Sequence, residues 1–210
     1  MLETIFNPEN AVFSFINKLL DLMMLSLVWF VCCLPVVTIG PAMAALYYAV
    51  VKTVRKERSY AVREFWKAFR DNLKQGILFQ LVIIVFGLLI LWTDLPLMLT
   101  FWNTEKTADT VLLILLAAKL FLYLGMFCWV YPLMSRFREK SLKLAEAALY
   151  LLLKYLPVSL GVIVLLGISV ILLIWEPLFV VIVPGTAVLF ASFMIEPALK
   201  KLCGKQEKEE

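Results

Sequence analysis

The sequence contains no histidine, and this absence removes the commonest general base and a frequent metal ligand. It also lacks the glycine-rich phosphate loop, the dinucleotide fingerprint and the nucleophile elbow of hydrolases. The four cysteines fit neither a disulfide framework nor a zinc site, because Cys32 and Cys33 are adjacent while Cys128 and Cys203 stand alone. We therefore expect a protein that is not an enzyme, with no catalytic residues, no cofactor and no metal site.

Charged residues are also scarce. They make up 17% of the 210 residues, whereas hydrophobic residues make up 63%, and the excess lies in long apolar runs that are typical of membrane helices. We predict an all-α fold, a polytopic membrane helical bundle of five or six transmembrane helices with one or two cytoplasmic amphipathic interfacial helices. The lipid bilayer is the expected partner. Nucleic acid is not, because the net charge of +4 is clustered in a way that indicates membrane topology.

The clusters of charge divide one transmembrane domain, residues 1–210, into successive segments. These are a helical hairpin over 1–58 with a Pro/Gly break at 35–41, a cytoplasmic amphipathic helix over 59–75, a hairpin over 76–135, a cytoplasmic basic segment over 136–155, a hairpin over 156–199 and a charged tail over 200–210. The positive-inside rule places the basic segments and the C-terminus in the cytoplasm of a cell-membrane protein. If residues 41–56 cross the membrane fully, which the charge pattern favours, there are six spans and the N-terminus is cytoplasmic; if they are re-entrant, there are five.

Polar residues recur along one face of the first apolar helix. Asn10, Ser14, Asn17 and Asp21 are spaced at i, i+4, i+7 and i+11. Such a face should meet protein or water rather than lipid. We favour a polar seam that packs this helix against its neighbours over the lining of a polar cavity, because these residues lie toward the end of the helix at the membrane surface.

One lysine is expected deep in the membrane. Lys119 lies about nine residues into a span that begins near Thr110, roughly 13 Å deep at the helical rise. An unpaired lysine there costs on the order of 2.5–3.5 kcal/mol. We predict a structural ion pair with Asp94, with Glu176 as the other candidate partner.

The first basic segment contains an amphipathic helix. Its apolar face is formed by Val62, Phe65, Trp66, Phe69 and Leu73, and its polar face is mostly basic. We predict that this helix lies in the lipid headgroup layer or docks a partner protein. The candidate residues for either role are Arg63, Phe65, Trp66, Lys67, Phe69 and Arg70.

Two later segments give further expectations. Residues 141–154 favour a helix with Leu142, Ala145, Leu149 and Leu152 on one face. Pro184 and Gly185 interrupt the last predicted span and are expected to kink it.

Two stretches resemble a known family. Leu34-Pro-Val-Val-Thr-Ile-Gly-Pro-Ala42 followed by Ala45-Leu-Tyr-Tyr48, and then Phe65-Trp-Lys-Ala-Phe-Arg-Asp-Asn-Leu-Lys-Gln75, resemble the YesL family of bacterial membrane proteins of unknown function. Members are often encoded beside ATP-driven carbohydrate importers. The resemblance therefore implies an accessory subunit or assembly partner that contacts importer permease subunits. The alternative is a small transporter or channel in its own right.

Overall fold

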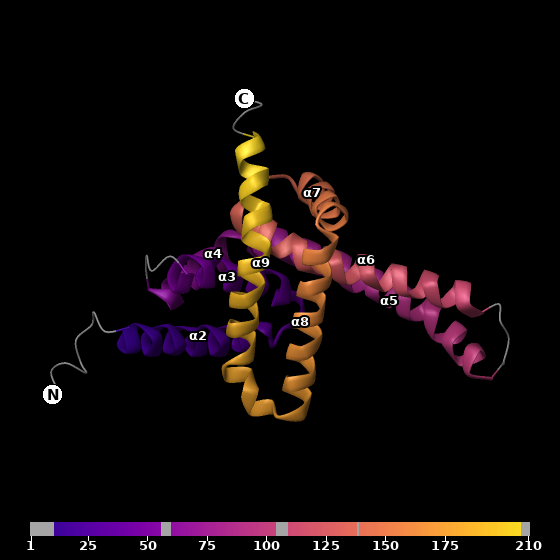
Figure 1. The fold of residues 1–210 in the computed structure, drawn as a ribbon, viewed down its shortest axis with the longest axis horizontal. Coiled ribbons are helices and arrows are strands. Elements are labelled where there is room, and N and C mark those ends of the chain that lie inside the picture. The colour runs from indigo at the N-terminus through magenta and orange to yellow at the C-terminus, as the bar shows by residue number, and fades with distance from the viewer. Residues whose placement is uncertain (1–10, 56–59, 104–108, 138, 207–210) are drawn as a thin grey trace.

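The computed structural model describes residues 11–55, 60–103, 109–137 and 139–206, and within them the chain is helical with no strand. The all-α prediction is confirmed (Figure 1). The helices are α2 (Ala11–Cys33), the 3₁₀-helix η1 (Val36–Thr38), α3 (Ile39–Ala49), the π-helix η2 (Val50–Arg55), α4 (Ala61–Asp71), α5 (Leu73–Asn103), α6 (Asp109–Arg136), α7 (Ser141–Lys154), α8 (Leu156–Trp175), the 3₁₀-helix η3 (Pro177–Val181) and α9 (Val183–Gln206).

The centre of the fold is α3, which packs against α2, α4, α5, α6 and α9. Its small residues make this possible: Ala42, Ala45 and Ala49 are fully buried, and small side chains let helix backbones approach closely. The closest approach joins Gly40 to the start of α5, where a Cβ atom on Gly40 would lie only 2.4 Å from the carbonyl oxygen of Gly76. Without side chains at these two positions, α3 and α5 meet backbone to backbone.

Among the described residues, five helical segments are long and apolar enough to cross a membrane. They are Phe15–Cys33, Val36–Arg55, Leu73–Pro96, Leu113–Arg136 and Leu156–Trp175. The number agrees with the lower prediction, but the set differs, because it includes the segment after the Pro/Gly break and leaves out the last helix. That helix, α9, is apolar only up to Lys200 and contains Glu196.

The second span differs from the others in its surroundings. Of the segment Val36–Arg55, 61% is buried inside the protein, against 11% of Leu156–Trp175. The segment that could have been a re-entrant helix is therefore the core around which the more lipid-exposed helices are arranged.

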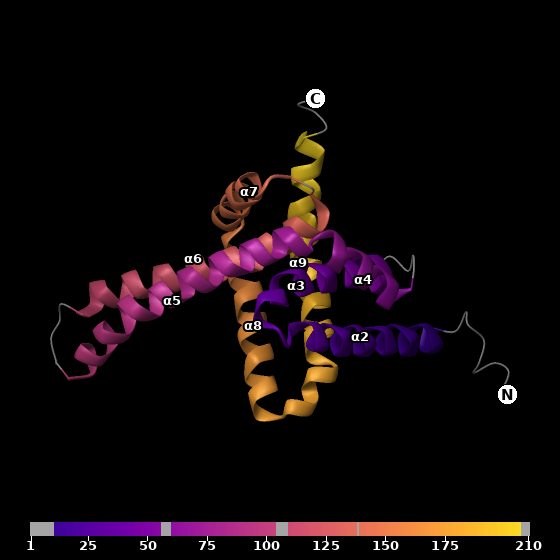
Figure 2. The same ribbon diagram turned by 180° about the vertical axis from the view of Figure 1, so that it is seen from behind.

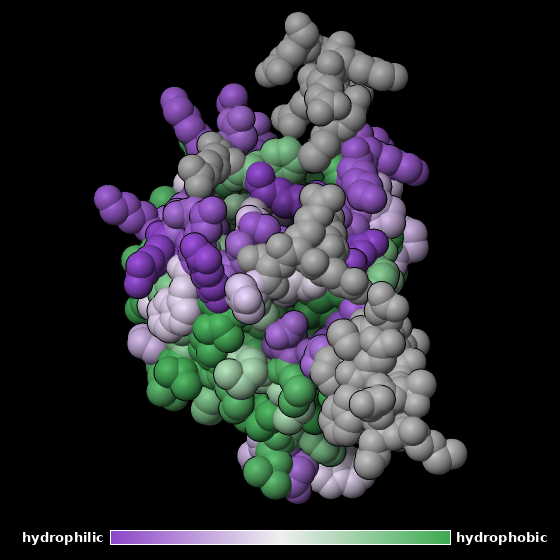
Figure 3. Space-filling model, turned by 90° about the vertical axis from the view of Figure 1, so that its left-hand side faces the viewer, coloured by the Kyte–Doolittle hydropathy of each residue, from purple (hydrophilic) through white to green (hydrophobic). Residues whose placement is uncertain are grey.

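Two hairpins leave this centre in different directions. Figures 1 and 2 show α5 and α6 side by side as one long arm, and α8 and α9 as another. Their outer parts carry exposed apolar side chains, among them Leu91 and Trp92 on α5 and Ile174 and Trp175 on α8. In Figure 3 hydrophilic side chains gather on the upper part of the visible face, and hydrophobic ones lie beneath them. This separation of polar and apolar surface fits a protein that is embedded in a bilayer.

The predicted break between the first two helices is present, and the side chain of Thr38 forms hydrogen bonds across it. The Thr38 hydroxyl lies 2.6 Å from the carbonyl oxygen of Cys32 and 2.7 Å from that of Pro35. The last carbonyls of a helix have no partner within the helix. Thr38 thus supplies a donor to the carboxyl end of α2 at the corner where the chain turns into α3.

Two sequence expectations are wrong in detail. The last apolar segment is not kinked at Pro184, because α9 only begins at Val183 and proline fits the first turn of a helix. In α7 the buried face consists of Leu144, Ala148, Leu151 and Leu152, so of the predicted residues only Leu152 belongs to it, and Leu142 is 80% exposed.

Candidate functional site

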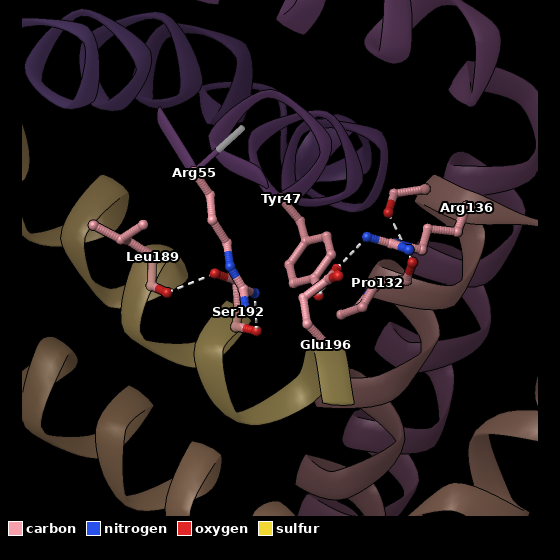
Figure 4. Close-up of polar contacts among 8 residues, drawn as sticks. Tyr47, Arg55, Pro132, Arg136, Leu189, Ser192 and Glu196 are labelled. Carbon is pink, nitrogen blue, oxygen red and sulfur yellow. Dashed lines mark hydrogen bonds and ion pairs between the residues drawn. The ribbon is translucent and has the colours of Figure 1, made fainter. Parts of the chain in front are cut away.

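A buried ion pair joins two helices at one end of the core. Glu196 of α9 is 1% exposed, and its Oε1 accepts hydrogen bonds from the Arg136 guanidinium of α6 and, at 3.2 Å, from the Tyr47 hydroxyl of α3. Figure 4 shows the Tyr47 ring between Arg55 and Arg136, with the Glu196 carboxylate beside its hydroxyl. One carboxylate therefore connects α3, α6 and α9.

The π-helix η2 places a second arginine against α9. Arg55 is its last residue, and the guanidinium donates to the carbonyl oxygen of Ser192 at 2.9 Å. The same guanidinium lies over the ring of Phe193, 4.7 Å from its centroid, a cation–π contact. Short π-helical segments often occur at functional sites, and here the segment carries the side chains that bind its neighbours.

The other cation of η2 anchors α4. Lys52 Nζ lies 2.7 Å from Glu64 Oε2 and donates to the Tyr48 hydroxyl at 3.3 Å. The α4 helix also packs closely against α3, and its Phe65 is fully buried. The position of α4 is therefore fixed both by apolar contact and by an ion pair.

Beside this anchor lies a polar cavity of about 200 Å³. Residues of α3, α4, the α4–α5 junction and α6 line it, and they are Tyr48, Lys67, Ala68, Asp71, Asn72, Met134, Ser135 and Arg136. Arg136 thus contacts Glu196 and also lines the cavity. A much smaller apolar cavity, about 40 Å³, lies between α3, α6, α8 and α9, with Met43, Phe127 and Val162 in its wall.

The structure does not gather the predicted polar seam into a site. Asn10 lies outside the described residues, and Ser14 lies in α2. Asn17 is exposed and Asp21 is half-buried. The buried polar contact of α2 is made instead by Ser26, whose hydroxyl accepts a hydrogen bond of 2.9 Å from the backbone N–H of Gly185 in α9.

Lys119 and Asp94, the two residues expected to pair within the membrane, do form an ion pair in the structure. It connects α5 and α6, the two helices of one hairpin. The Thr93 hydroxyl donates to the same Asp94 Oδ1 at 3.0 Å. The Asp94 carboxylate therefore accepts hydrogen bonds from two side chains, those of Lys119 and Thr93.

The candidate interfacial or docking helix is α4, and its side chains divide into two groups. Phe65 and Phe69 are buried in the core, so the expectation that these two rings face the headgroup layer or a partner is wrong, because α4 packs with this face against the rest of the protein. Arg63, Lys67 and Arg70 are exposed, and Trp66 is 43% exposed. The face that remains available is basic with a single large aromatic side chain.

The contact between Glu196 and Arg136 was not predicted. The sequence did carry a signal, since a carboxylate in an otherwise apolar helix needs a partner. It did not identify the partner, because Arg136 is 60 residues away and stands among other basic residues. Among the described residues no group of three or more Cys, Asp or Glu side chains could hold a metal ion.

Comparison with family models finds a match over part of the chain. A family model described as a protein of unknown function, DUF624, matches residues 22–95. The matched stretch runs from α2 through α3 and α4 into α5 and therefore contains the central helix and the helix anchored to it. No curated protein and no solved structure matches the chain. The chain is thus similar over this stretch to a family whose activity is not established, and its apolar helices fit an integral membrane protein.

Proposed function

We propose that this integral membrane protein is an accessory subunit or assembly partner of an ATP-driven carbohydrate importer in the cell membrane, with no catalytic activity of its own. The proposal rests on the resemblance to the YesL family together with one structural observation. That observation is the exposed basic face of α4, which is presented by a helix held rigidly against the core. The proposal includes six crossings, with α9 as the sixth beside the five candidate spans, and in that topology this face and both termini lie in the cytoplasm.

The exposed side chains of α4 and the fixed position of this helix favour a protein partner. A docking surface is strengthened by an aromatic anchor and arginines on a fixed backbone. On α4 these are Trp66, Arg63 and Arg70, while Phe65 and the ion pair to Lys52 hold the helix in place. The partner surface is expected to be acidic and to lie on the cytoplasmic side of the permease subunits.

Copurification tests this proposal. The tagged full-length protein is extracted from its native membranes in mild detergent, and bound proteins are identified by mass spectrometry. We expect importer permease subunits with the wild-type protein and their loss with the double variant Trp66→Ala, Arg70→Gln. The control Lys200→Gln, Lys201→Gln removes two exposed charges elsewhere and should retain them. Recovery of no importer subunit with the wild-type protein would contradict the proposal.

The alternative function is that of a small transporter or channel. The ion pair between Lys119 and Asp94 is its main support, because charged residues inside membranes often belong to transport pathways. Liposomes containing the purified protein would show uptake or leak of sugars or ions in that case. Under the accessory-subunit proposal they should behave like empty liposomes.

A further inference from the structure

We propose that α7 lies in the membrane surface and inserts a stripe of three leucines, Leu142, Leu149 and Leu153, among the acyl chains of phospholipids. This gives α7 the membrane-surface role that the sequence predicts for α4, whose phenylalanines are buried in the core. The occupant of the exposed leucine face is bilayer lipid, rather than another protein or a second copy of the chain. The inference does not depend on the importer partner.

The side chains of α7 form three faces. The first is buried against the protein and contains Leu144, Ala148 and Leu151. The second is exposed and apolar and consists of Leu142, Leu149 and Leu153. The third is exposed and polar and consists of Lys143, Tyr150 and Lys154. Both exposed sets are spaced at i, i+7 and i+11, and the polar set begins one residue later, so its face is turned about 100° around the helix. Glu146 is exposed at the edge between the two. Adjoining apolar and polar faces are typical of a helix between lipid and water.

The position of α7 along its neighbours places it at the membrane boundary. One candidate span ends at Arg136 before α7, another begins at Leu156 after it, and Figures 1 and 2 show α7 at the end of α8. The helix runs back along α6, because a Cβ atom on Gly125 would overlap the side chain of Leu152. Gly125 precedes Arg136 by 11 residues, about 16 Å at the helical rise. A helix beside the last three turns of a span lies in the boundary layer rather than free in the aqueous solution.

The leucine face continues into the surface of a span. Leu156 and Leu160 of α8 are exposed, and they follow Leu153 by three and seven residues. They belong to the candidate span Leu156–Trp175, which is mostly exposed. Acyl chains cover the exposed apolar side chains of a membrane span. The same lipid layer can therefore cover Leu153 and the rest of the stripe without interruption.

The polar face carries side chains that are typical of the headgroup layer. Lys154 Nζ donates to the Tyr150 hydroxyl at 2.9 Å and lies 5.1 Å from the centroid of the Tyr150 ring. Tyrosine is enriched at membrane–water interfaces, and lysine extends its ammonium group from an apolar stem toward the headgroups. Residues 139–154 contain three lysines and two glutamates, so their net charge is small. The contact with lipid therefore rests on the leucines and does not require an anionic headgroup.

Spin labels test the proposal. The purified full-length protein carries a nitroxide on a cysteine introduced by Leu142→Cys, Leu149→Cys or Leu153→Cys, and it is reconstituted at high dilution in phosphatidylcholine vesicles. Collisions of the label with oxygen, which concentrates in lipid, are compared with collisions with a water-soluble nickel chelate. We expect all three positions to favour oxygen, as the reference Leu160→Cys in α8 does, at a depth of about 5–10 Å. The matched control Lys143→Cys, one residue from Leu142, should favour the nickel chelate. The labelled wild-type protein measures the signal from the native cysteines.

Two results with the spin labels overturn the proposal. If the nickel chelate reaches the leucine positions as readily as Lys143→Cys, the leucine face lies in water. If neither reagent reaches them, a second copy or another part of the chain covers the face. A photoreactive benzophenone side chain at Leu149 in native membranes gives an independent measurement, in which a phospholipid adduct supports the proposal and a protein adduct overturns it. The labelled positions are exposed, so the core is left intact and a negative result cannot be attributed to misfolding.

Discussion

Glu196 connects three helices through the hydrogen bonds of one carboxylate oxygen. Its carboxylate is almost fully buried and accepts bonds from Arg136 and Tyr47. Removing one partner of a buried ion pair leaves an uncompensated charge, which costs about 3–5 kcal/mol. We therefore predict that Glu196→Gln lowers the thermal unfolding temperature of the protein in detergent, as measured by the fluorescence of its tryptophans.

A double variant distinguishes a paired charge from mere packing. In Arg136→Met, Glu196→Gln no charge is left unpaired, so the double variant should be more stable than the sum of the single losses predicts. Lys143→Gln is the control, because its pair with Glu139 is exposed and 3.6 Å long and such pairs contribute about 0–1 kcal/mol. Additive losses in the double variant would show that the two side chains stabilise the fold independently.

Two ion pairs, Lys119 with Asp94 and Arg136 with Glu196, show which residue contacts can be predicted from the sequence and which cannot. Lys119 and Asp94 lie in consecutive helices of one hairpin, so the connection between the helices brings them to the same depth. Arg136 and Glu196 lie in helices that are not consecutive. Helical periodicity identifies the face of a helix but not which distant helix covers it, and this contact could be found only from the fold.

Among the elements, α3 and α5 depend on a contact that allows no side chain. A Cβ atom on Gly76 would lie 2.7 Å from the backbone nitrogen of Pro41 and 2.8 Å from its Cα atom. Backbone atoms cannot move aside as a flexible side chain can. We predict that Gly76→Ala destabilises the protein by about 1–3 kcal/mol, the usual cost of overpacking, which thermal unfolding in detergent would measure.

Gly167 supplies the matched control within a helix. Nothing lies within 4 Å of a Cβ atom at that position. Because alanine is the better helix former by about 0.5–1 kcal/mol, Gly167→Ala should leave the stability unchanged or raise it. If both alanine variants changed stability by the same amount, helix propensity rather than backbone contact would explain the effect.

The helix α7 shows where periodicity fails. Leucine and alanine occur on more than one of its faces, and the sequence offers Leu142 and Leu149 as readily as Leu144 and Leu151. The choice between them is made by the contact of α7 with α6, which buries Leu144 and Leu151. By contrast, the strongly one-sided α4 was predicted within two residues at its start, because only one of its faces is apolar.

For the whole molecule, the sequence predicted the helical class and most of the spans, and the remaining prediction concerns topology. If α9 is a sixth crossing beside the five candidate spans and both termini are cytoplasmic, a cysteine introduced at Lys201 should react with a membrane-impermeant maleimide only after cells are permeabilised. A cysteine at Glu176, between α8 and η3, should react in intact cells. Labelling of native cysteines is the background, and the wild-type protein measures it. Reaction at Lys201 in intact cells would reverse the orientation.

The length of the helix that follows the turn between α2 and α3 determines how deep in the bilayer this turn lies. The segment from Ile39 to Arg55 consists of 11 α-helical and 6 π-helical residues, about 26 Å at the α-helical rise, which is less than the roughly 30 Å of a bilayer core. If Arg55 lies at one membrane surface, the turn between α2 and α3 lies inside the bilayer and does not reach the opposite surface. A backbone turn at that depth finds no water, and the Thr38 hydroxyl supplies the donor that water would otherwise provide to the carbonyl of Cys32. The hydrogen bond from Thr38 thus satisfies this backbone carbonyl without water, so the turn can lie in contact with lipid.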